Sequence, residues 1–168
     1  MSDRGPDSAG IAMYSPADAG VSKVTIQSDD RDAFAQVQNA LGQLSDAPVS
    51  MVERDTHAVL EVPADAVSRV RGEIAANHPS VRVMSSGESV EIYKEVGLPS
   101  SVVERFGIRQ MSGSHGVGHT RMATESAVTT MGAHPFSTDE DQCLVHNGSL
   151  SNHNSLRRKL IRNGMNFE

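Results

Sequence analysis

Hydrophobic and polar positions follow two different periods along the middle of the chain. Short alternating runs predict strands at 23–27, 81–83 and 90–93, together with a hairpin over 49–62 that bends near Arg54. Between these runs apolar residues recur three or four positions apart. They predict two helices with inward faces formed by Phe34, Val37, Leu41 and Leu44, and by Val67, Val70 and Ile74. This order of elements over 21–95 is typical of a split βαβ, ferredoxin-like unit.

Runs on either side of that unit predict further strands at 8–14, 117–121 and 141–145. A short helix should end near Phe106, and the acidic turn 139–141 should be solvated. After residue 148, Asn152 or Asn154 can cap a last helix that stops at Gly164. Its inward positions would be Leu156, Leu160 and Ile161. The pattern as a whole is that of a mixed α and β protein.

Composition narrows the class of protein without naming it. Hydrophobic residues make up 38% of the 168 positions but aromatic residues only 4%, so the core must rest mainly on aliphatic side chains. The net charge of −6 argues against a nucleic-acid partner. A single cysteine excludes an internal disulfide framework, and neither a secretion signal nor a membrane-spanning run is evident. We therefore expect a cytoplasmic protein that does not bind a membrane.

Two polar motifs indicate one binding pocket. In GHTRMAT, at 118–124, Arg121 supplies a permanent cation whose planar donors suit a carboxylate. In HNG, at 146–148, Asn147 and Gly148 can offer a side-chain amide and a close backbone N–H to a developing oxyanion. Plainer readings exist: Arg121 could form a surface ion pair, and Asn-Gly is a strong hairpin signal.

Three motifs in order carry a resemblance to a known family. RGPDSAG at 4–10, GHTRMAT at 118–124 and HNGSLSNHNSLRRKL at 146–160 together resemble the class II glutamine amidotransferases, which are N-terminal-nucleophile (Ntn) enzymes. The likeness is greatest to the amidotransferase-like subunits of glutamate synthase and N-methylglutamate synthase. It implies that 1–20 and 96–168 form part of an amidotransferase domain. Residues 21–95 would be an inserted subdomain. The implied fold is α+β, a four-layer αββα Ntn arrangement.

The resemblance also implies an activity and residue roles. The protein would hydrolyse glutamine to glutamate and pass ammonia to a synthase partner, without a metal or organic cofactor. Arg121 and Thr124 would bind the substrate, and Asn147 and Gly148 would form the oxyanion hole, with Gly148 also contacting the substrate. Supporting roles would fall to Arg4, Asp7 and His134.

The nucleophile is the main departure from the family pattern. The family uses an N-terminal cysteine, but this chain begins Met1-Ser2 and holds only Cys143, which reads as a small buried hydrophobe. Ser2 adjoins the wrong motif to replace it. We therefore expect a fragment lacking both termini and inactive as given. The alternative is a non-catalytic amidotransferase-like subunit that serves a synthase as a structural or sensing partner.

Overall fold

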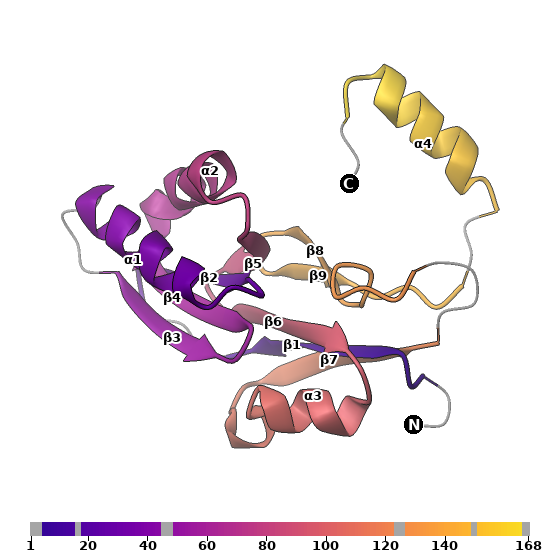
Figure 1. The fold of residues 1–168 in the computed structure, drawn as a ribbon, viewed down its shortest axis with the longest axis horizontal. Coiled ribbons are helices and arrows are strands. Elements are labelled where there is room, and N and C mark those ends of the chain that lie inside the picture. The colour runs from indigo at the N-terminus through magenta and orange to yellow at the C-terminus, as the bar shows by residue number, and fades with distance from the viewer. Residues whose placement is uncertain (1–4, 16–17, 45–48, 123–126, 149–150, 166–168) are drawn as a thin grey trace.

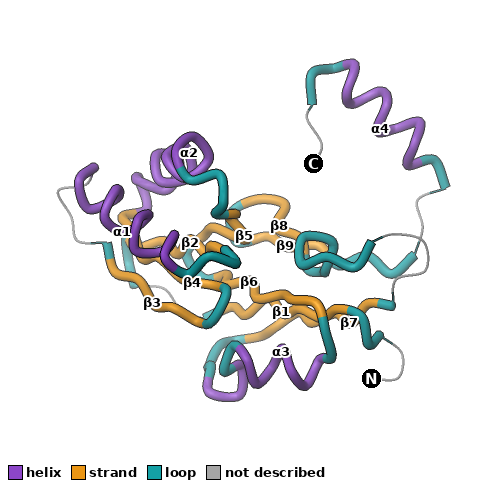
Figure 2. Tube along the Cα trace, viewed as in Figure 1, coloured by secondary structure: helices purple, strands orange, loops and turns teal. Residues whose placement is uncertain are grey.

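The computed structural model describes residues 5–15, 18–44, 49–122, 127–148 and 151–165. Within these ranges the strands form three antiparallel sheets, with orders β3-β4-β2-β5, β6-β1-β7 and β8-β9. Four α-helices accompany them (Figures 1 and 2). The α+β class is therefore confirmed. No helix in the described ranges is long and apolar enough to cross a membrane.

The middle of the chain forms the four-stranded sheet with two helices on one face (Figure 1). Its elements are β2 (Val21–Gln27), α1 (Asp32–Leu44), β3 (Ser50–Arg54), β4 (His57–Pro63), α2 (Val67–Asn77) and β5 (Arg82–Gly87). The order β3-β4-β2-β5 is the one a split βαβ unit gives, because each helix returns the chain past one intervening strand. Asp55 bends the β3–β4 hairpin at a φ of 57°.

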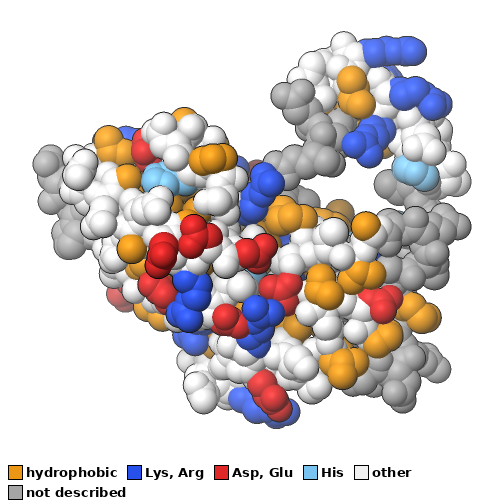
Figure 3. Space-filling model, in the orientation of Figure 1, with side chains coloured by type: hydrophobic (Ala, Val, Ile, Leu, Met, Phe, Trp, Pro, Cys, Tyr) orange, Lys and Arg blue, Asp and Glu red, His pale blue; other side chains and the backbone are white. Residues whose placement is uncertain are grey.

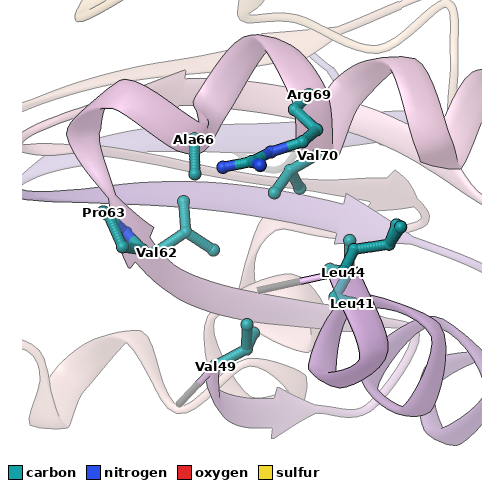
Figure 4. Close-up of a pocket in the computed structure, with 8 residues that line it drawn as sticks. All are labelled: Leu41, Leu44, Val49, Val62, Pro63, Ala66, Arg69 and Val70. Atoms are coloured by element: carbon teal, nitrogen blue, oxygen red, sulfur yellow. The ribbon is translucent and has the colours of Figure 1, made fainter. Parts of the chain in front are cut away.

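Amphipathic spacing decides how α1 and α2 pack on this sheet. Phe34, Val37 and Leu41 of α1 are buried, as the period predicted, and so are Val67, Val70 and Ile74 of α2. Leu44 is an exception, because at the last position of α1 it is 46% exposed. The small hollow between the two helices holds about 10 Å³ of free space, roughly one water (Figure 4). This is therefore a packed core and no binding cavity.

The three-stranded sheet brings together strands that are far apart in sequence. Its members are β1 (Ser8–Tyr14) in the centre, flanked by β6 (Val90–Val96) and β7 (His115–Arg121). The sequence pattern predicted that strand 90–93 belongs to the middle unit, whereas the structure pairs this strand with β1. α3 (Pro99–Arg105) follows β6 and buries Val102 against a cluster that includes Tyr93 and Phe106.

His57 marks the seam between these two sheets. It lies on β4 with no exposed surface, and its ring packs at 4.7 Å from Phe106 and 5.8 Å from Tyr93, centroid to centroid. Burial, helped by the positive charges of Lys94 and Arg105, lowers the pKa of His57 to about 3. The imidazole is therefore neutral in the folded protein over the range in which a solvated histidine gains a proton.

The turn of the β8–β9 hairpin is held against the body by the Asp141 carboxylate. β8 (Phe136–Asp139) and β9 (Gln142–Leu144) meet at Asp141, whose φ is 54°. Its side chain accepts hydrogen bonds from the backbone N–H groups of Glu88, Ser89 and Val90 at 2.7–2.9 Å, and another from the Ser89 hydroxyl. Burial alone would raise the pKa of Asp141, but these bonds outweigh it and lower the pKa. The expectation of a solvated acidic turn was therefore wrong for Asp141.

The last helix, α4 (His153–Arg162), stands away from the rest of the chain (Figure 1). Gly164 follows it at a φ of 85°, as expected for the residue after a helix end. Leu156 and Ile161, expected to face inward, are 47% and 51% exposed, because no described element packs against them. Basic side chains gather on this helix (Figure 3).

His57 should make the protein sensitive to acid. Below about pH 6.5 the unfolded chain binds a proton at this position, whereas the folded chain does not bind it until about pH 3. The free energy of unfolding therefore falls as the pH falls through this window. Between pH 7 and pH 5 the loss should be about 2 kcal/mol, at 1.36 kcal/mol per unit. Urea unfolding of the wild type and of His57→Leu at both pH values measures the difference. His153→Asn, at an exposed position of α4, is the control. Equal pH dependence in the His57 variant and the wild type would contradict the assignment.

Removing the Asp141 carboxylate should release the hairpin. Asp141→Ala leaves three backbone N–H groups without their acceptor, and we expect a loss of about 2 kcal/mol in unfolding free energy. Glu140→Ala, at the exposed neighbouring position, should cost less than about 0.5 kcal/mol. Chemical denaturation compares the two variants, and similar losses would show that the carboxylate does not anchor the hairpin.

Candidate functional site

One row of residues crosses the three-stranded sheet and defines the candidate site. Gly10 on β1 lies opposite Lys94 on β6 and opposite His119 on β7, and two residues earlier Ser8 lies opposite Arg121. Side chains alternate between the two faces of a strand, so these positions share one face. Further along that face the row becomes apolar, with Ala12, Ile92, Val90 and Val117. The polar end of this sheet face is therefore the candidate site.

A return segment, residues 127–136, covers this polar end. Gly10 makes the close approach possible: a Cβ there would lie 2.3 Å from the carbonyl oxygen of His134 and 2.5 Å from Lys94 Cβ. Lys94, only 3% exposed, donates hydrogen bonds from Nζ to the carbonyls of Met131 (3.3 Å) and Ala133 (2.9 Å). Its ammonium also lies 4.6 Å from the ring centroid of Phe136. Glycine on the sheet and a buried lysine thus hold the segment in place.

Arg121 is half-buried at the end of β7 and rests against the same segment. Its Nη1 donates to the carbonyl of Ala127 at 3.4 Å. On the opposite side of the turn, a Cβ on Gly132 would lie 3.1 Å from Nη1. Its own carbonyl accepts from the backbone N–H of Asp7 at 3.2 Å, which places Asp7 beside the arginine through the main chain.

The HNG motif reaches the same place from β9. The backbone N–H of His146 donates to His134 Nδ1 at 3.3 Å, and the His134 ring packs against His119 and Phe136, both at 4.5 Å. Asn147 and Gly148 follow and are exposed, with Gly148 at a φ of 152° that favours glycine. His134 is therefore the residue that connects the two sequence motifs.

The electrostatics of this cluster are positive. Burial, and after it the charges of His119, Arg121, Lys94 and His146, lower the pKa of His134 to about 4. Burial and then the charge of Arg121 also lower the pKa of His119. Burial lowers the pKa of Lys94 to about 8. Near neutral pH the imidazoles of His119 and His134 are thus uncharged while Lys94 remains a cation beside the permanent cation Arg121, an arrangement that favours an anionic ligand group.

Two polar atoms at this end are buried without a hydrogen-bond partner in the described part of the chain. They are Ser8 Oγ and His119 Nδ1, on neighbouring strands of the same sheet face. Buried polar atoms are normally satisfied by protein or by ordered water, so their presence beside Arg121 is consistent with a polar ligand or water site. Within the described residues, no group of three or more His, Cys, Asp and Glu residues is arranged to hold a metal ion.

The structure treats the sequence-predicted residues unequally. Arg121 and the start of the HNG motif lie near the His134 ring. Arg4, Thr124 and Ser2 lie outside the described residues. Cys143 packs at the apolar end of the sheet face, where its Sγ accepts from Tyr14 Oη at 3.4 Å. It packs there against apolar side chains, as expected from its neighbours, but it is half-buried where full burial was expected.

Sequence reasoning missed Lys94, Ser8 and His119 as parts of this cluster. Ser8 and His119 lie inside the quoted motifs, but no residue spacing shows that they share a sheet face. Lys94 offered one usable signal, since a lysine in the run Val90–Val96 interrupts an otherwise strand-like pattern. Only the pairing of β6 with β1 reveals its neighbours.

Comparison with known proteins agrees with the motifs. The chain is 60% identical over 169 residues to the glutamine amidotransferase-like protein GlxB of Rhizobium meliloti, covering all of this chain and 56% of that protein. It is 29% identical over 181 residues to a putative glutamine amidotransferase of Methanothermobacter thermautotrophicus, covering all of this chain and 59% of the relative. Glutamine–fructose-6-phosphate aminotransferase (isomerizing) of Thermococcus kodakarensis is 34% identical over 86 residues, 51% of this chain and 14% of that enzyme.

These matches confirm the resemblance drawn from the sequence motifs: the chain is homologous to class II glutamine amidotransferases. It spans a little over half the length of the first two relatives. No protein-family model matches the chain.

Proposed function

We propose that this chain carries the glutamine-binding and oxyanion-stabilising part of a glutaminase that supplies ammonia to a synthase partner. The observation that carries the proposal is the meeting of Arg121, His134 and the HNG motif at one positively charged sheet end. The amidotransferase relatives give the same chemistry by name. The three-stranded sheet and helix α3 would belong to a four-layer Ntn arrangement. The middle unit, residues 21–95, would be an insertion in that arrangement.

Each proposed role follows from the chemistry of the group. Arg121 binds the α-carboxylate of glutamine, because it is a permanent cation held at a half-buried position. Thr124 would add a hydrogen bond to the same substrate, and Arg4 and Asp7 would support the site from the first strand. His134 shapes the pocket. It is neutral near pH 7 and accepts a backbone hydrogen bond, which fits a positioning role.

The proposed reaction is acyl transfer through a thioester. A cysteine thiolate attacks the side-chain amide carbonyl, and the tetrahedral oxyanion is stabilised by the Asn147 amide and the Gly148 N–H. Ammonia leaves after protonation of the amide nitrogen, and water then hydrolyses the glutamyl thioester to glutamate. The nucleophile implied by the family resemblance has no counterpart among these 168 residues, because the only cysteine is Cys143 at the other end of the sheet face.

That position of Cys143 favours a second candidate function. A protein that keeps Arg121 and the HNG motif but lacks a thiol beside them would bind glutamine without hydrolysing it. Such a subunit would serve a synthase as a structural or sensing partner. Calorimetric titration of the full-length protein with L-glutamine, together with an assay of glutamate release, separates the two. Binding with release supports the glutaminase, and binding without release supports the sensor. The absence of both binding and release would reject both candidate functions.

Arg121→Ala should mainly weaken binding. A buried or half-buried charge-assisted hydrogen bond contributes about 1.5–3 kcal/mol, so the Kd for glutamine should rise roughly 10- to 100-fold. Arg109→Ala removes an exposed arginine elsewhere and serves as the matched control. An unaltered Kd in the Arg121 variant would remove Arg121 from the substrate site.

Asn147→Ala should affect turnover and leave binding nearly intact. The amide is used only when negative charge develops on the substrate oxygen, and the loss of one such donor lowers the rate by about 10²–10³. In the full-length protein, steady-state glutamate release gives kcat and KM for the variant and for Asn163→Ala, a control at the end of α4. Unchanged kcat in Asn147→Ala would exclude the oxyanion role.

A further inference from the structure

Lys94 is the most buried cation in the candidate site, and no sequence motif draws attention to it. It lies within β6 with 3% of its surface exposed, and its Nζ reaches two main-chain carbonyls, those of Met131 and Ala133. The third side of the ammonium faces the Phe136 ring. All three contacts belong to one stretch of six residues, so Lys94 fastens that stretch to the sheet.

The fastened stretch is also the support of Arg121. The two carbonyls that Lys94 binds flank Gly132, and a Cβ on Gly132 would lie only 3.1 Å from Arg121 Nη1. Earlier in the same segment, the Ala127 carbonyl accepts from that nitrogen. The guanidinium therefore hydrogen-bonds to the segment at Ala127 and lies close to Gly132, so its position depends on where the segment lies.

Glu95, the next residue of β6, holds the segment from the other side of the strand. Its Oε1 accepts a hydrogen bond from the Thr130 hydroxyl, and its Oε2 pairs with Arg105 at 3.5 Å. Lys94 and Glu95 thus bind consecutive parts of the segment, but only Lys94 lies on the sheet face that carries Arg121.

We propose that Lys94 is a positioning residue for substrate binding: its ammonium anchors segment 127–136 on the sheet and thereby fixes Arg121 in the orientation that receives the substrate carboxylate. This inference rests on the proposed function for the identity of the ligand. The anchoring itself is a property of the fold and can be measured without any ligand. Lys94 does not touch the reacting atoms, so it acts through Arg121.

The experiment compares three substitutions at this position in the full-length protein. Lys94→Met keeps the length of the apolar stem and removes the donors, Lys94→Gln keeps an uncharged donor, and Lys94→Arg restores a cation with several donors. Lys159→Met removes an exposed lysine from α4 and is the matched control. Amide hydrogen exchange of peptides covering 127–136 reports the anchoring, and calorimetric titration with L-glutamine reports the Kd.

Lys94→Met should speed exchange in segment 127–136 by about tenfold or more and raise the Kd by roughly 10- to 100-fold, since charge-assisted hydrogen bonds are lost. Lys94→Arg should restore most of both, and Lys94→Gln should lie between them. A merely structural lysine would instead raise exchange throughout the sheet, or change stability without recovery in Lys94→Arg.

The outcomes separate the two levels of the proposal. If the wild type binds no glutamine, the proposed function fails while the exchange data still test the anchor. If the wild type binds glutamine and Lys94→Met exchanges faster with an unchanged Kd, the link to Arg121 is wrong. Unchanged exchange in Lys94→Met overturns the anchor. Should Lys94→Met fail to fold, the comparison of Lys94→Gln with Lys94→Arg decides, and equal exchange and Kd in these two would overturn the role of the charge.

Discussion

The candidate site depends on one close approach, that of residues 131–136 to the face of β1 at Gly10. A Cβ at this position would lie 2.3 Å from the His134 carbonyl oxygen, so any other residue would push the segment off the sheet. With glycine in place, Lys94 and His119 flank an open strip of backbone, and the segment settles into it. The contacts of His134, Phe136 and Arg121 depend on this close approach, which the absence of a side chain at Gly10 allows.

The charges of the site follow from the same packing. The covering segment removes water from Lys94 and from the imidazoles, which lowers the pKa values of Lys94, His134 and His119 by burial. The histidines lose their charge near neutral pH, while Lys94 and Arg121 keep theirs. A region that holds two cations beside neutral donors is electrostatically matched to a carboxylate. This is the physical basis for the glutamine-binding proposal.

The two larger sheets are joined by partly buried polar groups as well as by apolar contact. Lys23 of β2 and Glu91 of β6 form an ion pair at 2.7 Å across the seam, and the Tyr93 hydroxyl donates to the same carboxylate at 2.6 Å. Burial alone would raise the pKa of Glu91, but these hydrogen bonds outweigh it and lower the pKa. Near them, His57 packs neutral between aromatic rings. Such groups tolerate few alternative arrangements, so the seam fixes how the two sheets meet.

The sequence by itself determined the elements whose causes are local. The helical period of Phe34, Val37 and Leu41 defined α1, and alternation together with a turn near Arg54 defined the β3–β4 hairpin. The motif residues Arg121 and Asn147 were found because three motifs occur in family order, and their catalytic roles remain predictions. Tertiary structure decided what spacing cannot encode. It paired β6 with β1 and gave Asp141 three backbone partners. It also left Leu156 and Ile161 uncovered, because burial depends on what packs against a helix as well as on its own period. Above all, it placed Lys94 beneath the segment that supports Arg121, since contacts between residues 37 and 39 positions apart arise only when the sheet forms.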